Sequence, residues 1–138
     1  MQLSQSVQQV LNEDRLCITL GGDHAIGIGT IHGFTQTYPE SCLLWIDAHA
    51  DINTMKNSGS GNMHGMPVAF NLPELRVQKK HFEKPFIEGL EPKLRPDRIA
   101  YIGLRDVDGP EREIIDKYGI ASYSMRDIDV MGVNKVSD

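Results

Sequence analysis

The feature that most constrains the fold is the alternation of short apolar runs with segments of helical periodicity. The apolar runs, which predict strands, are residues 16–22, 42–50 and 98–105, and residues 121–125 are predicted to form a fourth, short strand. The segments with apolar residues at helical spacing are residues 7–12, 23–38, 67–75 and 111–118. Parallel strands need such crossovers, and strands that are apolar along their whole length are typical of sheets covered on both faces. The sequence therefore predicts an α/β protein with a parallel sheet.

Composition and charge argue against several classes of protein. The 138 residues suit one domain, and 14 Lys and Arg against 19 Asp and Glu give a net charge of −5, which argues against nucleic-acid binding. No window approaches the roughly 20 apolar residues of a membrane helix. Residues 1–15 lack the basic and apolar regions of a secretory signal. Cys17 and Cys42 are predicted to be reduced and buried.

Two polar segments are predicted to lie outside the sheet. Residues 53–62 carry glycines and no periodicity, which predicts a long loop. Long loops in compact domains usually serve function. Residues 77–96 are charged and contain three prolines, which predicts an excursion over the surface.

The predicted strand ends carry the reactive side chains. In parallel sheets, functional groups gather beyond the carboxyl ends of the strands. The second strand leads into Asp47, His49 and Asp51, which share one face if the backbone is extended. Such groups, buried together, need a cation, and the excess of oxygen ligands favours Mn²⁺ over Zn²⁺ or Fe²⁺. The alternative is a polar strand end whose carboxylates bond to loop amides in solvent.

Other positions stay open on residue chemistry alone. His24 ends the preceding predicted strand and lies near the Asp-His-Asp cluster if the two strands are neighbours. His64 closes the polar loop and is either a proton relay or a surface histidine. Asp106 and Asp108 follow the third strand. They are either metal ligands or, for one of them, a salt-bridge partner of the adjacent Arg105.

Five motifs in order resemble those of the ureohydrolases. GGDH (residues 21–24) and DAHAD (residues 47–51) are similar to the first two metal-binding signatures of that family. INT (residues 52–54), SGNMHGMPV (residues 60–68) and IGLRDVD (residues 102–108) look like arginase rather than agmatinase. The resemblance covers nearly the whole chain.

This resemblance implies the three-layer α/β/α arginase–deacetylase sandwich with a parallel sheet. It also implies hydrolysis of L-arginine to L-ornithine and urea at two Mn²⁺ ions. By the resemblance, one manganese ion is bound by His24, Asp47 and Asp51. The other is bound by Asp47 and His49, so that Asp47 bridges the two ions. Two cations acidify a water molecule, which supplies the nucleophile that a poorly electrophilic guanidinium needs. The resemblance implies that His64, as a proton shuttle, and Asp51 are the catalytic residues.

The resemblance also assigns residues to substrate recognition. The residues implied to recognise the substrate α-carboxylate are Asn53 and Ser60, with Ser58 and Asn62 nearby. Asp108 is implied to bind the α-amino group, with Glu111 helping through a water molecule. Gly109-Pro110 stands where arginases commonly have the reverse order, which predicts a different loop geometry around Glu111.

The third metal signature of the family, an Asp-x-Asp after a further strand, is not found among the 138 residues. Nor is the glutamate that holds the guanidinium. We therefore interpret residues 1–138 as a partial arginase domain that lacks the N-terminal strand and the C-terminal half, and we do not expect turnover by this chain alone. The alternatives are an agmatinase-like ureohydrolase and a non-catalytic product that associates with partners.

The resemblance finally implies how the protein assembles and where it works. L-arginine is the implied small-molecule partner, with no nucleic acid and no membrane. Family members are typically homo-oligomers, above all trimers. The implied location is the cytoplasm, with the mitochondrion as the alternative.

Overall fold

The computed structural model describes residues 2–75 and 88–137, and the chain forms two compact units. The first unit comprises Met1–Ser41 and Asp51–Leu94, and the second comprises Cys42–Ala50 and Arg95–Asp138. The described part of the first unit is helical, and the second carries a parallel sheet with helices. The predicted combination of a parallel sheet with helices is therefore confirmed. No helix among the described residues is long and apolar enough to cross a membrane.

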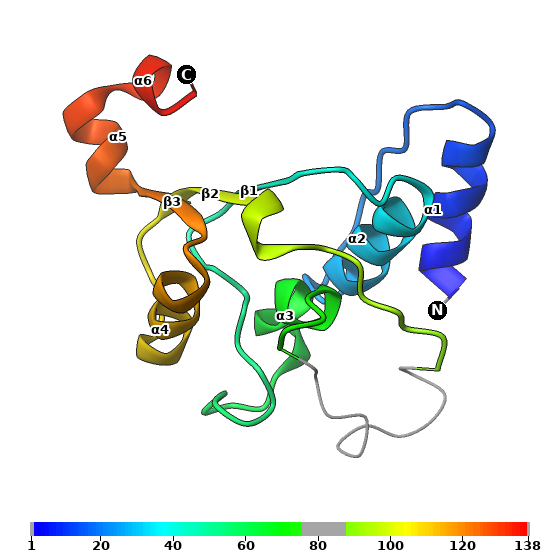
Figure 1. The fold of residues 1–138 in the computed structure, drawn as a ribbon, viewed down its shortest axis with the longest axis horizontal. Coiled ribbons are helices and arrows are strands. Elements are labelled where there is room, and N and C mark those ends of the chain that lie inside the picture. Colours follow the sequence, from blue (N-terminus) through cyan, green and yellow to red (C-terminus); the bar gives the residue numbers. More distant parts are fainter. Residues whose placement is uncertain (1, 76–87, 138) are drawn as a thin grey trace. The chain divides into compact units, whose positions relative to one another are not determined.

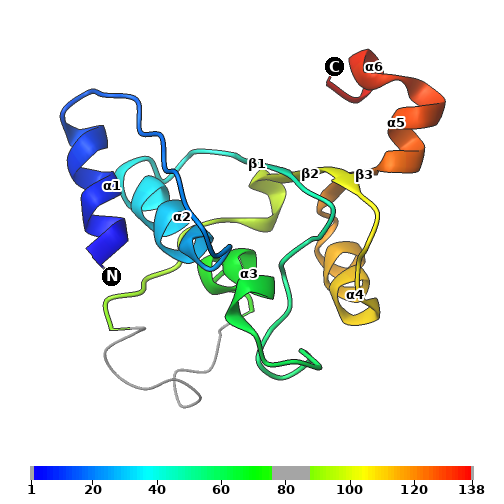
Figure 2. The same ribbon diagram turned by 180° about the vertical axis from the view of Figure 1, so that it is seen from behind.

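Two helices of the first unit, α1 (Gln2–Asn12) and α2 (Ile26–Thr37), lie side by side in both views (Figures 1 and 2). The contact face of α1 buries Val7 and Leu11, which are four residues apart and so share one side of a helix. Gly33 of α2 permits a close approach, because a Cβ atom there would lie 2.7 Å from the carbonyl oxygen of Ser4. The pair therefore packs nearly backbone to backbone at this point.

That close approach makes Gly33→Ala a sensitive substitution. The added methyl group would also lie 2.8 Å from Cβ of Val7, so α1 must shift. Overpacking costs about 1–3 kcal/mol, and alanine regains at most about 1 kcal/mol of helix propensity. We expect a net loss of about 1–2 kcal/mol in the free energy of unfolding, measured by urea titration. Gly29→Ala is the matched control, since its Cβ meets only the Leu3 side chain, at 3.1 Å. An equal effect of both substitutions would contradict the close approach.

The apolar core of the first unit gathers around α3 (Pro67–Asn71), which follows the short 3-10 helix η1 (Met63–Gly65). Its members are Ile28, Met66, Phe70 and Leu90. Pro67 begins α3, where its missing N–H removes no helical hydrogen bond. The core thus joins α2, α3 and the segment that follows residue 88.

A buried histidine adds a polar connection to this unit. His32 of α2 is 4% exposed, and its Nδ1 lies 2.7 Å from Oγ of Ser4 on α1. Its Nε2 accepts the backbone N–H of Glu91 at 3.1 Å. Because Nε2 accepts, the neutral ring carries its proton on Nδ1 and donates it to Ser4. One imidazole therefore links three segments, a role that the sequence did not indicate.

The second unit is built on three parallel strands in the order β1-β2-β3. Their bounds are Leu43–Ile46 for β1, Ile99–Leu104 for β2 and Ala121–Ser124 for β3. The 3-10 helix η3 (Pro96–Arg98) leads into β2. In register, Leu43 faces Ile99 and Ala100 faces Ala121. The central strand is the most buried, with Tyr101 fully covered.

An irregularity in β2 coincides with its glycine. Gly103 has a φ of +91°, and the register with β3 shifts between Ile102 and Leu104. A glycine inside a strand commonly marks such a bulge because it alone accepts this backbone. A Cβ atom there would also lie 3.5 Å from the carbonyl oxygen of Asp47. The bulge therefore shapes the chain beside the end of β1.

Three helices complete this unit: α4 (Gly109–Tyr118), α5 (Met125–Met131) and α6 (Val133–Ser137). α4 lies on one side of the strands in both views (Figures 1 and 2) and buries Ile114 and Ile115. It ends at Gly119, whose φ of +62° is the left-handed cap expected of a glycine stop. The predicted helix 111–118 and the predicted strands 98–105 and 121–125 are confirmed within one or two residues.

The predicted strand at residues 16–22 is wrong. These residues form no strand, and the side chains of Leu16, Ile18 and Leu20 are 75–91% exposed. A strand needs a ladder partner. The three described strands pair with one another in the second unit, whereas residues 16–22 belong to the first. An apolar pattern without a paired neighbour therefore stays outside the sheet, with its apolar side chains exposed.

Other expectations need smaller corrections. The run at residues 42–50 forms a strand only over β1, whose Leu44 and Ile46 side chains are exposed rather than covered. Cys42 is exposed and Cys17 is half-buried, so neither is the buried core residue that was predicted, although both are free thiols. α3 ends at Asn71. Of the predicted surface excursion, residues 77–87 lie outside the described residues, and the described part buries Leu90.

Candidate metal centre and substrate loop

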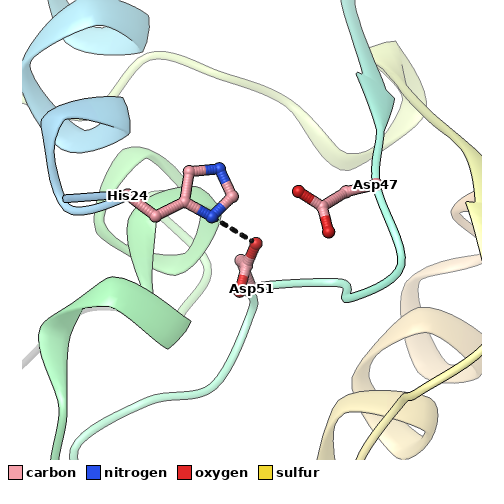
Figure 3. Close-up of side chains that lie close together, drawn as sticks. All are labelled: His24, Asp47 and Asp51. Atoms are coloured by element: carbon pink, nitrogen blue, oxygen red, sulfur yellow. Dashed lines mark ion pairs between the residues drawn. The ribbon is translucent and has the colours of Figure 1, made fainter. Parts of the chain in front are cut away.

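The first unit brings together His24 and Asp51, two of the predicted metal ligands. Nδ1 of His24 lies 3.2 Å from Oδ2 of Asp51, as the dashed line in Figure 3 marks. Asp23 precedes α2 and accepts the N–H of Ala25 on its side chain at 2.8 Å, which fixes the turn that presents His24. The His24 side chain is 42% exposed, whereas that of Asp51 is 7% exposed. The pair thus combines a buried carboxylate with an accessible imidazole.

Asp51 adopts an unusual backbone conformation. Its φ of +51° lies in the left-handed region, which non-glycine residues rarely enter and which is enriched at functional sites. Its carbonyl oxygen accepts the N–H of Val68 at 3.1 Å, which holds the conformation from the start of α3. The expectation that Asp47, His49 and Asp51 alternate along an extended strand is therefore wrong, because β1 ends at Ile46 and the chain turns at Asp51.

The second unit brings together Asp47, His49 and Asp106. The His49 N–H donates to Oδ1 of Asp47 at 2.9 Å, and its ring Nδ1 lies 3.4 Å from the same oxygen. Nε2 of His49 lies 3.4 Å from Oδ2 of Asp106. The carbonyl oxygen of Ala48 accepts the N–H groups of Arg105 and Asp106 at 2.9 and 3.0 Å, so the segments after β1 and β2 are bound to each other. Asp106 therefore contacts a predicted metal ligand.

The predicted substrate residues of the first unit lie on one closed loop. Its ends meet where the N–H of Asn53 donates to the carbonyl oxygen of Gly65 at 3.2 Å. Oγ of Ser58 accepts the N–H of Gly61, and Oγ of Ser60 accepts the N–H of Asn62. A hydroxyl that accepts a hydrogen bond keeps its own O–H to donate. The predicted loop at residues 53–62 is confirmed as a segment without strand or helix.

His64 and Asn53 differ sharply in exposure at the two ends of this loop. His64 lies on η1 and is exposed to solvent. Asn53 is 7% exposed, although a substrate-recognition role was predicted for it. Between them, Asn57 organises the loop, since its Oδ1 accepts from both the N–H and the hydroxyl of Thr54, at 2.6 and 2.8 Å. Asn57 was not among the predicted site residues, although an asparagine in a turn-forming stretch commonly bonds to its own loop.

Asp108 and Glu111 have a structural role at the start of α4. Asp108 is the N-cap residue, and Oε2 of Glu111 accepts its N–H at 3.1 Å in a reciprocal capping box. Pro110 lies in the first turn, where proline is favoured. Glu111 is buried and Asp108 is exposed, so only the latter presents its carboxylate at the surface. Their predicted roles toward a substrate stay predictions.

Comparisons with known proteins agree on one family. The model of the Arginase family matches residues 1–138. The chain is 46% identical to "Arginase-2, mitochondrial" of Homo sapiens over 137 residues, which are 99% of this chain and 38% of that protein. It is 46% identical to "Arginase, hepatic" of Aquarana catesbeiana over 99% of this chain and 42% of that protein. The chain thus spans about two fifths of the length of these relatives.

The structural likeness is equally strong. The crystal structure of a cold-adapted arginase from Glaciozyma antarctica matches with a TM-score of 0.86 at 41% identity, over 98% of this chain and 47% of that chain. The described fold is therefore a part of the arginase fold. Sequence and structure lead to the same conclusion: the chain belongs to the arginase family.

Proposed function

We propose that His24, Asp47, His49 and Asp51 bind divalent cations and that the preferred ion is Mn²⁺. The observation that carries this proposal is the buried Asp51 carboxylate at a left-handed backbone position, 3.2 Å from the accessible His24 imidazole. A buried carboxylate is costly unless a positive charge compensates it. Carboxylate oxygens mixed with imidazole nitrogens suit a borderline-to-hard ion such as Mn²⁺.

Asp47 and His49 complete the proposed ligand set. Three residues separate Asp47 from Asp51, so the chain itself keeps their α-carbons within about 14 Å. His49 already has one ring nitrogen 3.4 Å from Asp47 and the other 3.4 Å from Asp106. A carboxylate beside a ligating imidazole typically fixes the tautomer and the ring orientation. In this proposal, Asp106 has that positioning role for His49.

We further propose that the protein hydrolyses L-arginine to L-ornithine and urea. Membership of the arginase family and the names of its relatives support this reaction. When bound, manganese would supply the positive charge that lowers the pKa of water, so that a nucleophile is available at neutral pH. The described residues of the loop and of the start of α4 are proposed to recognise the amino-acid end of the substrate.

The loop and the start of α4 divide this recognition between them. The hydroxyl groups of Ser58 and Ser60, held by their bonds to loop N–H groups, donate to the α-carboxylate together with the amides of Asn53 and Asn62. The Asp108 carboxylate accepts from the α-ammonium group, and Glu111 supports it by holding its N–H. Neutral donors for the carboxylate and a carboxylate acceptor for the ammonium group thus orient the α-carbon of the substrate.

His64 is proposed to carry protons between the reaction and solvent. It is exposed on η1, directly after the loop. Imidazole exchanges protons near neutral pH more readily than any other side chain. Together with Asp51, it forms the proposed catalytic pair.

Assembly and location extend the proposal. Family resemblance favours a homo-oligomer, typically a trimer, that works in the cytoplasm. The name of the human relative, "Arginase-2, mitochondrial", supports the mitochondrion as the alternative.

The test compares L-arginine with agmatine, which lacks the α-carboxylate. With Mn²⁺ present, we expect L-arginine to bind at least about tenfold more tightly, because charge-assisted hydrogen bonds to the carboxylate are lost with agmatine. Calorimetry gives both dissociation constants, and release of urea is measured on the same samples. Ser60→Ala should reduce the preference, whereas Ser6→Ala on the exposed side of α1 should keep it.

Each outcome decides a different point. Tighter binding of agmatine contradicts the arginase proposal and favours the agmatinase-like alternative. Preference for L-arginine without urea agrees with the expectation that this chain alone does not turn over its substrate. Urea released from L-arginine supports the reaction and overturns that expectation.

A further inference from the structure

The second unit contains a cavity of about 580 Å³ that none of the roles discussed above uses. It is lined by residues from β2, β3, α4 and α5, near the carboxyl ends of the two strands. Its size falls within the range of small-molecule sites, about 300–1,000 Å³. The cavity therefore has room for a ligand of modest size.

Positive charge is concentrated in this cavity, although the whole chain is acidic. Three of the chain's 14 basic residues line it: Arg105, Arg112 and Arg126. They come from three different elements, since Arg105 follows β2, Arg112 lies on α4 and Arg126 lies on α5. Like charges that line one cavity repel one another, so a bound anion would reduce this repulsion.

The carboxylates of the cavity offset only part of this charge. Asp116 stands one turn after Arg112 on α4, yet no ion pair joins any of the three arginines to another residue within 2–75 or 88–137. The Asp127 carboxylate is engaged by Ser124, whose hydroxyl and N–H donate to it at 2.6 and 2.7 Å. These hydrogen bonds hold the pKa of Asp127 below its usual value. Three cations against two anions leave one excess positive charge.

A serine hydroxyl and an anchored arginine side chain give the cavity hydrogen-bond donors with defined directions. Ser122 and Ser124 are two residues apart on β3 and both line the cavity, as expected for residues on one face of a strand. Arg105 is held by a hydrogen bond from Nη1 to the carbonyl oxygen of Gly103 at 3.3 Å. Guanidinium groups pair with oxyanions through parallel hydrogen bonds, and the Ser122 hydroxyl adds a single donor, whereas that of Ser124 already donates to Asp127. This donor set fits a tetrahedral oxyanion with several terminal oxygens.

We propose that the arginine-lined cavity of the second unit binds phosphate, either as the free ion or as the headgroup of a small phosphate monoester. The site is separate from the proposed chemistry at Asp47 and His49, and its failure would leave the arginase proposal untouched. Neither source of phosphate requires a covalent step.

Binding is tested on the whole 138-residue chain with inorganic phosphate and with phenyl phosphate, by calorimetry at about 0.15 M salt, where exposed charges are strongly screened. Arg112→Gln and Arg126→Gln should each weaken binding about tenfold, because each removes a charge-assisted hydrogen bond. The control is Arg15→Gln, an exposed arginine paired with Glu13 in the first unit, which should keep the wild-type affinity. Circular dichroism verifies that each variant folds.

The two phosphate probes distinguish the free ion from a monoester as the ligand, and other outcomes contradict the proposal. Tighter binding of phenyl phosphate than of inorganic phosphate identifies a monoester site, and the reverse order identifies a site for the free ion. Acetate bound as tightly as phosphate overturns the assignment, as does an equal loss in Arg15→Gln. If neither inorganic phosphate nor phenyl phosphate binds, the proposal is also overturned.

Discussion

Replacing Asp51 with asparagine should lower the affinity of the chain for Mn²⁺ by more than about 100-fold, because loss of even an outer partner of a metal ligand costs about 10–100-fold. The substitution keeps the size of the side chain and removes only its charge. Asparagine also tolerates the left-handed conformation better than other non-glycine residues, so the φ of +51° is preserved. The expected loss is therefore a loss of ligand charge rather than of backbone geometry.

A second residue provides a matched control for that experiment. Asp14 has a φ of +53° in the turn after α1 and is exposed, so Asp14→Asn repeats the substitution in the same backbone conformation away from the proposed ligands. We expect this variant to keep the Mn²⁺ affinity of the wild type in calorimetric titrations. If Asp51→Asn also keeps it, the carboxylate is not a ligand and the proposed metal centre is wrong.

Thermal unfolding gives a further readout of the same substitution. A ligand that binds only the folded chain stabilises it by about 2.7 kcal/mol when present at 100 times its dissociation constant. Mn²⁺ should therefore raise the Tm of the wild type and of Asp14→Asn, but not that of Asp51→Asn. Without metal, Asp51→Asn should unfold at the same or a higher temperature, because it removes a buried charge.

The first unit should lose stability in mild acid because of His32. Burial is the main cause that lowers the pKa of this imidazole below its usual value, and the positive charge of Lys93 adds to the effect. The unfolded chain then binds a proton on His32 at a higher pH than the folded chain does. The stabilisation is therefore fully present above the ordinary histidine pKa of about 6.5 and is lost as the pH falls from there toward the folded-state value.

His32→Gln tests this assignment. Urea unfolding at pH 7 should show a loss of about 1–3 kcal/mol, because the bonds to Ser4 and to the Glu91 N–H are buried. Between pH 7 and pH 5 the variant should lose less stability than the wild type, since glutamine does not titrate. His64→Gln, at an exposed histidine, should behave like the wild type in both respects. A wild-type pH dependence in His32→Gln would refute the assignment.

The elements that the sequence predicted correctly carry their own local signals. β2 is an apolar run, and α4 ends at a glycine that separates it from β3. The run at residues 16–22 has an equally apolar pattern, but a strand also depends on a neighbour that pattern cannot supply. Periodicity therefore predicts which segments are able to form strands, and pairing decides which of them do.

The candidate site shows the same difference between what a local pattern predicts and what tertiary structure decides. Motif and chemistry were enough to propose His24, Asp47 and Asp51 as candidate ligands. They did not predict the turn at Asp51, because an alternating pattern carries no information about a single left-handed residue. The contact between His49 and Asp106 depends on the pairing of β1 with β2, across more than fifty residues of sequence. Such long-range contacts arise from tertiary structure alone.

The interleaving of the two units bears on how the chain is synthesised. β1 pairs with β2 through Leu43 and Ile99, so 56 residues (99 minus 43) separate the partners. At about 5–20 residues per second, the ribosome completes β2 roughly 3–11 s after β1. During that interval the second segment of the first unit, Asp51–Leu94, is synthesised. Until β2 follows, β1 has no strand partner for its backbone and its apolar side chains. Nascent chains paused in this window are therefore the ones most exposed to aggregation and most dependent on chaperones.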